Sequence, residues 1–521
     1  MIIFEWVLGI LLGSVLLSVL AKQIRVPYPA LLALGGTVLA FVPGAPRIML
    51  DPELALALFV APVLLDAAYD TSPRDLRDNW LPVTCLVLVA VCLTTGAVAL
   101  VARGLTGMPW AAAIALGAIV APPDAAAATA VLRQVSLPHR IVTVLEGESL
   151  LNDASALLIY RLAVTAVSVG SIGLGETAPT LALTIIGSLI AGPVLALSYM
   201  RLVTVLNRSG DTATSIILQF IGTFGVWLLA DRLGLSGILT IVAYAVTIAR
   251  RAPATTPARL RVPSYAVWET AVFVLNVLAF ALIGLQIGPI FEMLAPEQRA
   301  HYLIVAAAVL ATVILIRFAW VMSYNWVARA HIRRVGFHPP RPMMAPTVKS
   351  GLIVSWCGMR GIVTLVAALA LPNGDGGPPF PHRDLIVFVA FCVVLGTLVI
   401  QGFSLRPLLL KLNLRDDDPV GREVARARTA AYRTALASLD GDGSELAQAL
   451  RVELEAALGQ ANGAGADGGG GAPGDRLRLR VASAARQAVL AMRNSGEIGD
   501  AAFHRLEEEI DRIELSAGAF G

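Results

Sequence analysis

Residues 146–153 read Glu146-Gly147-Glu148-Ser149-Leu150-Leu151-Asn152-Asp153. They place three carboxylates, an amide and a hydroxyl in a segment that is otherwise as apolar as a membrane span. A charge at the middle of a bilayer costs at least ~2.5 kcal/mol on insertion scales, and charged residues at that depth therefore mark functional sites. The stretch predicts a membrane protein whose interior handles ions.

The rest of the chain has the composition of a polytopic membrane protein. Of its 521 residues, 56% are hydrophobic and 15% are charged, whereas soluble domains contain about 25% charged residues. Apolar runs of membrane-spanning length recur from residue 2 to about residue 410. We predict an all-α polytopic membrane protein with about thirteen spans, centred near residues 12, 36, 60, 91, 120, 153, 190, 221, 242, 278, 313, 359 and 397.

Arginine and lysine are unevenly divided between the loops that join these spans. Most lie in loops on one side of the membrane, whereas the opposite loops hold only Arg47, Arg103, Arg232, Arg299 and Arg383, with Arg161 near that end of the sixth span. Basic loops are typically cytoplasmic. We therefore expect a multi-pass protein of the cell (inner) membrane, with the N-terminus outside and the C-terminus in the cytoplasm.

The composition changes after Leu410, which predicts a boundary between two domains. We expect a transmembrane domain over residues 1–415 and a cytoplasmic helical tail over residues 416–521. Within the tail, helices are expected over 416–459, 476–494 and 500–515, with a Gly-rich flexible linker over 461–474. A regulatory or oligomerisation role and a solvated extension without a ligand are both open for this tail.

The polar run 146–153 is expected to lie on a helix from Ile141 to Val164. At 1.5 Å per residue, Asp153 is ~18 Å from the cytoplasmic end of that helix, close to the middle of the membrane. We interpret Asp153 as the residue that handles the ion.

The polar side chains of this helix cover a sector of about 160° with two flanks. Ser149 and Asp153 lie on one flank with Glu146, and Glu148 and Asn152 lie on the other. One flank can therefore face an ion while the other contacts a structural partner. For Glu148 we favour the structural role, in a buried polar network between helices.

A helix break is expected in the preceding span, which contains Ala121-Pro122-Pro123-Asp124. Paired prolines remove backbone donors, and the freed carbonyls must then face protein or a water-filled cavity. Secondary transporters build cation sites from such broken helices. Asp124 follows the break at a helical N-terminus, where it can act as an ordinary N-cap, as an ion ligand, or as both.

Two arginines are expected inside membrane spans of the second half. Arg360 lies between glycines in the stretch Ser355–Gly361, and Arg317 lies in the apolar run 303–321. Intramembrane arginines face a polar interior and usually pair, so Glu148 with Arg317 is the preferred pair. Arg360 either holds the carbonyls of the second broken helix or shapes the field around the ion. Snorkelling to the surface is the alternative, stronger for Arg317, which lies nearer a predicted span end.

Motifs of other function classes are missing from the sequence. It contains no G-x-x-x-x-G-K-[ST] phosphate loop, no H-E-x-x-H zinc motif and no T-V-G-Y-G-like filter. Residues 147–151 lack the second glycine of a G-x-S-x-G serine elbow. We expect a transporter that is not an enzyme, needs no cofactor and binds no nucleic acid, with a cation at Asp153 and Asp124 as its only metal.

Four stretches carry a family resemblance: Gly147–Ala154, the break at Asp124, Leu235–Leu239, and Ser355–Gly361 continuing to Leu371-Pro372. They resemble the monovalent cation:proton antiporter-1 family, the bacterial NhaP-type sodium/proton exchangers, over roughly residues 5–410. The resemblance implies thirteen helices with inverted repeats and broken helices, and usually a homodimer. It also implies a six-helix core that moves against a dimerisation domain in an elevator-like cycle.

The resemblance implies roles for the polar residues of both breaks. Asp153 would bind either the cation or the proton, and Asp124 and Ser149 would help to coordinate the ion with a backbone carbonyl near Pro123. Asn152 belongs to the same cation-binding set, and its place beside Asp153, instead of a second aspartate, implies electroneutral one-for-one exchange.

The remaining charges are implied to be structural. Glu148 would pair with Arg317, and Arg360 would be a further structural charge partner. The chain departs from the family at the first break, where Pro123-Asp124-Ala125 stands in place of the common Thr-Asp-Pro. A threonine hydroxyl is lost there, which leaves the ion selectivity open.

These observations predict a secondary active antiporter that exchanges a monovalent cation, Na⁺ first, for H⁺. A carboxylate at the midplane would hold a proton or a small cation with comparable free energy, never both, and alternating access would then couple the two. Exchange of K⁺ (or Li⁺) for H⁺ is the alternative within the class. The alternative from another class is a membrane sensor or channel-like protein that works through its tail.

Overall fold

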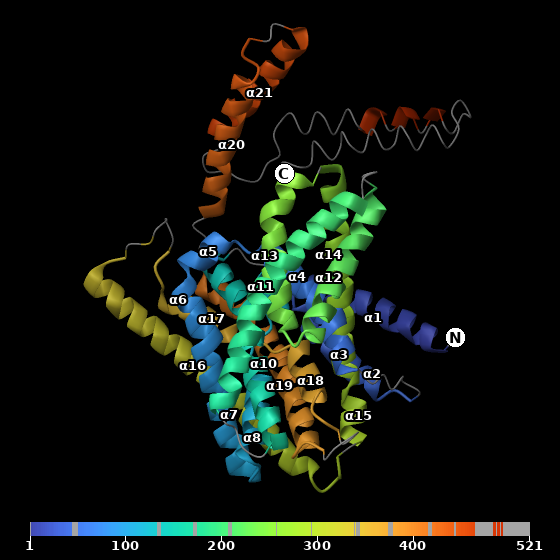
Figure 1. Ribbon diagram of the computed structural model, residues 1–521, viewed down its shortest axis with the longest axis vertical. Helices are drawn as coiled ribbons and strands as arrows, with labels where there is room; N and C mark the ends of the chain where they lie inside the picture. The colour runs from blue at the N-terminus through green and yellow to red at the C-terminus, as the bar shows by residue number, and fades with distance from the viewer. Residues whose placement is uncertain are drawn as a thin grey trace. The chain divides into compact units, whose positions relative to one another are not determined.

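The computed structural model describes most of the chain. The described residues are 2–43, 51–132, 137–169, 174–206, 211–256, 258–292, 294–337, 339, 344–373, 379–414, 419–441, 444–463, 483–485, 487–489 and 491–492. Over these ranges the regular structure is entirely helical. The chain divides into two compact units, Met1–Asp417 and Asp418–Gly521, and Figure 1 shows the helices of each.

Nine helical segments in the described ranges are long and apolar enough to cross a membrane. In chain order they are α1 (Ile2–Ile24), α3–η1–α4 (Pro52–Asp70), α6–η2–α7 (Trp80–Thr106), α10 (His139–Val169), α11 (Leu174–Leu206), α12 (Thr212–Arg232), α14 (Ala258–Leu285) with α15 (Ile287–Glu292), α16 (Arg299–Val335) and α19 (Arg383–Leu412). The predicted all-α membrane fold is therefore confirmed. Here η1 and η2 are single π-helical stretches, Leu56–Val60 and Cys85–Ala90.

The four other predicted spans coincide with one short helix, with a 19-residue helix that is not among the nine candidates, and with two interrupted helices. They are α2 (Tyr28–Ala40), α13 (Gly237–Thr255), the pair α8 (Trp110–Val120) and α9 (Ala125–Leu132), and the pair α17 (Val348–Trp356) and α18 (Ile362–Leu369). A short helix, α5 (Pro73–Asp78), precedes α6 (Trp80–Thr84). Because length alone does not show that these four cross the bilayer, the count of thirteen stays a prediction.

Both interruptions arise from local sequence. Pro122 and Pro123 cannot donate backbone hydrogen bonds, and α8 ends just before them. The second interruption lies between Trp356 and Ile362, where Gly358 lets a neighbouring helix come close. A Cβ on Gly358 would lie 2.8 Å from Arg317 Nε of α16, so only glycine admits that side chain.

The two broken helices lie in the centre of the first unit. There α8 packs against α10 and α18, and α18 packs against α19, as the neighbouring ribbons in Figure 1 show. Large apolar side chains on the outer helices are exposed instead; on α11 these include Leu183, Ile186 and Ile190. An exterior of this kind suits contact with lipid.

The second unit contains a helical hairpin in its described part. Helices α20 (Pro419–Ala437) and α21 (Glu445–Gly463) pack together, and Arg451 donates to the Leu439 carbonyl at 2.9 Å. The single helical stretch predicted over 416–459 is therefore two helices. The predicted linker begins later than expected, because α21 includes residues 461–463. The rest of that linker and the helix predicted over 500–515 lie outside the described residues, as does most of the helix predicted over 476–494.

Candidate functional site

The two helix breaks cross each other. The backbone N–H of Asp124, just after the first break, donates to the carbonyl of Met359 in the second, at 2.6 Å. This bond brings the chain near residue 124 against the chain near residue 359. A broken helix deep in an apolar protein must satisfy its freed backbone groups internally, and here each break supplies a partner to the other.

Arg360 stabilises this crossing from a fully buried position, with 1% of its surface exposed. Its Nε donates to the Val120 carbonyl and its Nη2 to the Ala121 carbonyl, each at 3.0 Å, and its Nη1 donates to the Gly358 carbonyl. The first two are the unsatisfied carbonyls at the C-terminus of α8, where a positive charge also favours the helix dipole. The sequence suggested the carbonyls of the second break, whereas Arg360 mainly holds those of the first.

The backbone of Arg360 is fixed from the other side by α19. Its N–H donates to Thr397 Oγ1 at 3.0 Å. Thr397 is fully buried, and it has no local sequence feature that would have assigned it to the site.

Glu148 and Arg317 lie in contact, joining α10 to α16. The guanidinium donates to both carboxylate oxygens, at 2.5 and 2.9 Å, and also to the Val354 carbonyl of α17 at 3.0 Å. Their exposed fractions are 1% and 3%. Arg317 was expected near a span end, but α16 continues to Val335 and places it in the middle of a long helix. The snorkelling alternative for Arg317 is therefore wrong.

Asn152 lies on the same flank of α10 as Glu148 and stabilises the first break. Its Nδ2 donates to the Pro123 carbonyl at 2.9 Å, and the residue has no exposed surface. A carbonyl oxygen has two lone pairs, so the Pro123 oxygen keeps one for a further partner.

A large cavity of about 2280 Å³ reaches the crossing. Asp124, Ser149 and Asp153 line it, together with Pro123. Four of the five residues predicted to bind the cation therefore face one space, from α10 and from the first break. The fifth, Asn152, contacts the back of the break instead.

Gly361 is a site residue that the sequence did not single out. It lines the same cavity, and a Cβ added to it would overlap the Asp124 carboxylate. The Asp124 side chain therefore occupies the space that the missing side chain leaves. The sequence feature that could have identified Gly361 is its position directly after an arginine inside an interrupted membrane span.

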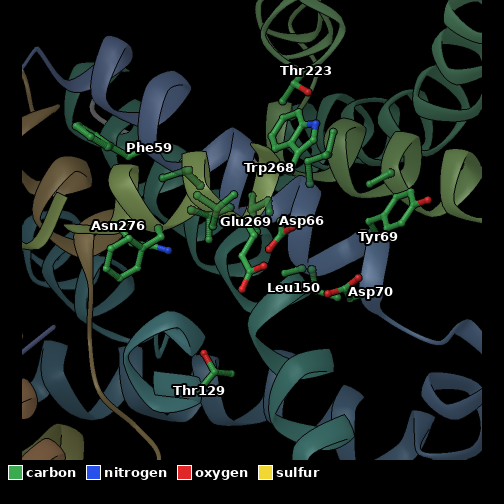
Figure 2. Close-up of a pocket in the computed structure, with 18 of the residues that line it drawn as sticks. Phe59, Asp66, Tyr69, Asp70, Thr129, Leu150, Thr223, Trp268, Glu269 and Asn276 are labelled. Atoms are coloured by element: carbon green, nitrogen blue, oxygen red, sulfur yellow. The ribbon is translucent and has the colours of Figure 1, made fainter. Parts of the chain in front are cut away.

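Further acids line the same cavity from α4 (Ala61–Asp70) and α14. Asp66, Asp70 and Glu269 line it (Figure 2). These residues were not predicted from the sequence, although Asp66 and Asp70 are four residues apart in an apolar span and so share a helix face. Basic residues line the cavity as well: Lys22, Arg25, Arg201, Arg250, Arg251, Arg261 and Arg406.

The arrangement defines a class of protein. Two interrupted helices cross inside a bundle of membrane-spanning helices, and carboxylate, hydroxyl and carbonyl oxygens beside the crossing face a deep cavity. Secondary transporters bind cations in sites of this kind. A family model described as "Sodium/hydrogen exchanger, transmembrane" matches residues 1–411, and the chain belongs to this family of monovalent cation:proton antiporters.

Individual relatives agree with this assignment. An uncharacterized Na⁺/H⁺ exchanger of Mycobacterium tuberculosis is 33% identical, over 96% of this chain and 93% of its own length. A sodium, potassium, lithium and rubidium/H⁺ antiporter of Bacillus subtilis is 30% identical, over 81% of this chain and 63% of its own. Among solved structures, the sodium proton antiporter MjNhaP1 of Methanocaldococcus jannaschii shares the fold, with a TM-score of 0.58 and 16% identity over 79% of this chain and 99% of that one.

Proposed function

We propose that this protein exchanges Na⁺ for H⁺ across the cell membrane, one for one, and that the two ions compete for Asp153. The observation that carries the proposal is that Asp153, Asp124 and Ser149 line one cavity beside the crossing of the two broken helices. These side chains offer oxygen ligands, which suit a hard monovalent cation, and a carboxylate that can take the proton.

The proposed mechanism is competition followed by alternating access. A cation on Asp153, with Asp124, Ser149 and the free lone pair of the Pro123 carbonyl as further ligands, excludes a proton from the same carboxylate. The loaded core then exposes the site to the other side, where the second ion replaces the first. Acidification of the cytoplasm would stop cation uptake from that side, because protons occupy Asp153.

Electroneutral exchange follows from the neutral residue beside Asp153. Asn152 cannot bind a transported proton, and its amide is engaged with the Pro123 carbonyl. Glu148 is engaged with Arg317 in a buried pair. With these two residues held, Asp153 gives up one proton for each cation that it accepts.

We further propose that the exchanger is the transmembrane part over residues 1–415, working as a homodimer, with residues 416–521 as a cytoplasmic tail. The distribution of Arg and Lys between the loops supports an N-terminus outside and a C-terminus inside. All the basic residues that line the cavity belong to the loops or helix ends expected in the cytoplasm. The structure would then represent the state that is open to the cytoplasm.

Potassium is the second candidate substrate. The first break lacks the threonine common in the family, and the Bacillus subtilis relative is named for sodium, potassium, lithium and rubidium. A site with one hydroxyl fewer holds a small ion less tightly, which favours a broader range of cations.

Proton movement in proteoliposomes tests the proposal. A pH gradient is imposed on vesicles that contain the purified full chain, and Na⁺, Li⁺ or K⁺ is added in turn, with and without a clamp on the membrane potential. We expect Na⁺ to dissipate the gradient at a rate that the clamp does not change. A clamp-sensitive rate would contradict electroneutrality, and dissipation by K⁺ alone would identify potassium as the substrate.

Two matched variants separate the site from general damage. Asp153→Asn should abolish cation-dependent proton movement, whereas Asp211→Asn, which replaces an exposed N-cap carboxylate of α12 by another good N-cap, should leave it unchanged. Full activity in Asp153→Asn would overturn the single-site mechanism. Absence of exchange with any cation at acid, neutral or alkaline pH would favour the sensor alternative.

A further inference from the structure

A second pocket lies at the end of the core helices, apart from the ion cavity. It has a volume of about 90 Å³ and lies between η2, the first turns of α10, the second half of α16 and the start of α17. Its walls are mainly apolar and include Leu86, Val144 and Val321, which pack together as a small separate cluster.

A half-buried cation lies at this pocket, with no anionic partner among the described residues. Arg140 donates from Nε to Asn79 Oδ1 at 3.1 Å and from Nη1 to the Met344 carbonyl at 2.9 Å. Both acceptors are neutral, and no described carboxylate forms an ion pair with Arg140. Its guanidinium also lies 5.7 Å from the centre of the Phe337 ring. The positive charge at the pocket is therefore held in place, and no carboxylate of the described residues neutralises it.

Two aromatic residues of α16 add polar groups to the same pocket. Trp320 and Tyr324 both line it, and they are four residues apart on one helix face. The indole Nε1 of Trp320 is buried and has no hydrogen-bond partner among the described residues. A buried donor without a partner is unfavourable, so the pocket as it stands lacks an acceptor at this depth.

We propose that this pocket binds one anionic phospholipid of the cytoplasmic leaflet. The lipid phosphate would pair with Arg140 near the Tyr324 hydroxyl, and an ester carbonyl of the lipid would accept from Trp320 Nε1. Because Trp320 and Tyr324 are separated by one helical turn, ~6 Å, the two groups lie at different depths, as the phosphate and ester carbonyl of a lipid do. The acyl chain would follow the apolar wall.

The charge and the surroundings of the pocket favour a lipid. Anionic headgroups attract arginine at the membrane surface, and Arg140 supplies a fixed charge with an apolar groove beside it. On α16, Trp326 and Val327 are 61% and 56% exposed, as expected for side chains in contact with lipid. The assignment to the cytoplasmic leaflet rests on the proposed orientation of the protein. The requirement that the lipid headgroup be negatively charged depends neither on that orientation nor on ion exchange.

Cysteine protection tests this proposal, because Cys85 lines the pocket and Cys92, seven residues further on, is exposed on α7 (Val91–Thr106). The full chain is reconstituted in vesicles of phosphatidylcholine alone or with phosphatidylglycerol, and reaction with a membrane-permeant maleimide is followed at each thiol by mass spectrometry. We expect phosphatidylglycerol to slow the labelling of Cys85 and not that of Cys92. Equal protection by the neutral lipid, or protection of both thiols, would overturn the proposal.

Variants test the contacts one by one. Since a hydrogen bond to a charged group changes affinity by about tenfold or more, Arg140→Gln should raise the phosphatidylglycerol fraction needed for half-protection of Cys85 by at least that factor. Arg140 also holds Asn79, and that variant could fail to fold. Trp320→Phe leaves the Asn79 contact intact and should weaken protection in the same direction.

Soluble glycerol phosphate is the final arm of this experiment. It offers the phosphate without the acyl chain and should not protect Cys85. Protection by glycerol phosphate equal to that by phosphatidylglycerol would show a phosphate site instead of a lipid site. Unchanged protection in both Arg140→Gln and Trp320→Phe would also overturn the proposal. Labelling requires no transport, so failure of ion exchange and failure of lipid binding are distinguishable.

Discussion

Removing both charges of the Glu148–Arg317 pair should destabilise the protein far less than the sum of the two single removals. The pair is nearly inaccessible to solvent and bidentate, with distances of 2.5 and 2.9 Å. Glu148→Gln leaves the guanidinium buried without a counter-charge, which costs about 3–5 kcal/mol. Arg317→Met leaves the carboxylate in the same state and also strands the Val354 carbonyl, for a total of about 4–8 kcal/mol.

The double variant separates the charge from the packing. If the two effects were independent, Glu148→Gln with Arg317→Met would cost about 7–13 kcal/mol. No unpaired charge remains in the double variant, however, and only an amide and a carbonyl lack partners. We expect a cost of about 2–6 kcal/mol, which is a coupling of several kcal/mol between the two positions.

These costs can be measured by unfolding the purified chain in mixed micelles with increasing SDS. Tryptophan fluorescence follows the unfolding. The matched control is the exposed Arg451–Asp440 contact at 3.6 Å, where Asp440→Asn should cost less than about 1 kcal/mol. Additive losses in the double variant would refute the reasoning. A double variant that folds well but has lost cation-driven proton movement would show that Glu148 takes part in ion binding.

Three further perturbations test the geometry of the core and its surroundings. Gly361→Ala should fold, because a φ of −132° suits alanine. It should nevertheless lower transport in proteoliposomes about 100-fold, because the added Cβ overlaps the Asp124 carboxylate and a misplacement of a site group by about 1 Å costs that factor. Gly284→Ala should lower the unfolding free energy by about 1–3 kcal/mol in the same SDS titration, because its Cβ would collide with the backbone of α2. Burial alone would raise the pKa of the Asp75 carboxyl, but its contacts with His139 and other neighbours outweigh burial and hold that pKa below its ordinary value. The ionised Asp75 carboxylate therefore stabilises the folded protein above its ordinary pKa of about 3.9, and this contribution is lost as the pH falls through the lower folded-state pKa. Asp75→Asn should lower the free energy of unfolding at neutral pH and have little effect on it in strong acid.

The features that the sequence predicted are those with a local cause. The adjacent residues Pro122 and Pro123 remove two successive backbone donors at the point where α8 ends, and the membrane penalty on charge singles out Asp153 among apolar neighbours. The 3.6-residue period alone separates the flank of Asp153 from that of Glu148. The helical fold, the two interruptions and the sides of α10 therefore follow from the order of the amino acids.

The contacts between the two breaks could not be derived in this way, because they join residues about 240 positions apart. Arg360 reaches Val120 and Ala121 instead of the carbonyls of its own break, and no periodicity links these positions. The acids on α4 and α14 (Asp66, Asp70 and Glu269) could have been predicted from the sequence, because a charge in an apolar span is the signal that identified Asp153. Their place on the cavity wall, by contrast, depends on how the helices pack.

The bonds between the two breaks have a consequence for the proposed exchange. They are made by the Asp124 backbone N–H and the Arg360 guanidinium, and the Asn152 amide of α10 also holds the first break. None of these groups changes charge when a carboxylate gains or loses a proton. The side chains of Asp124 and Asp153 face the cavity instead. Protonation of Asp153 therefore removes none of these bonds. In the proposed mechanism a proton and a cation then compete on one fixed framework, so their exchange would be set by the difference between two binding free energies, without a cost for rebuilding the site.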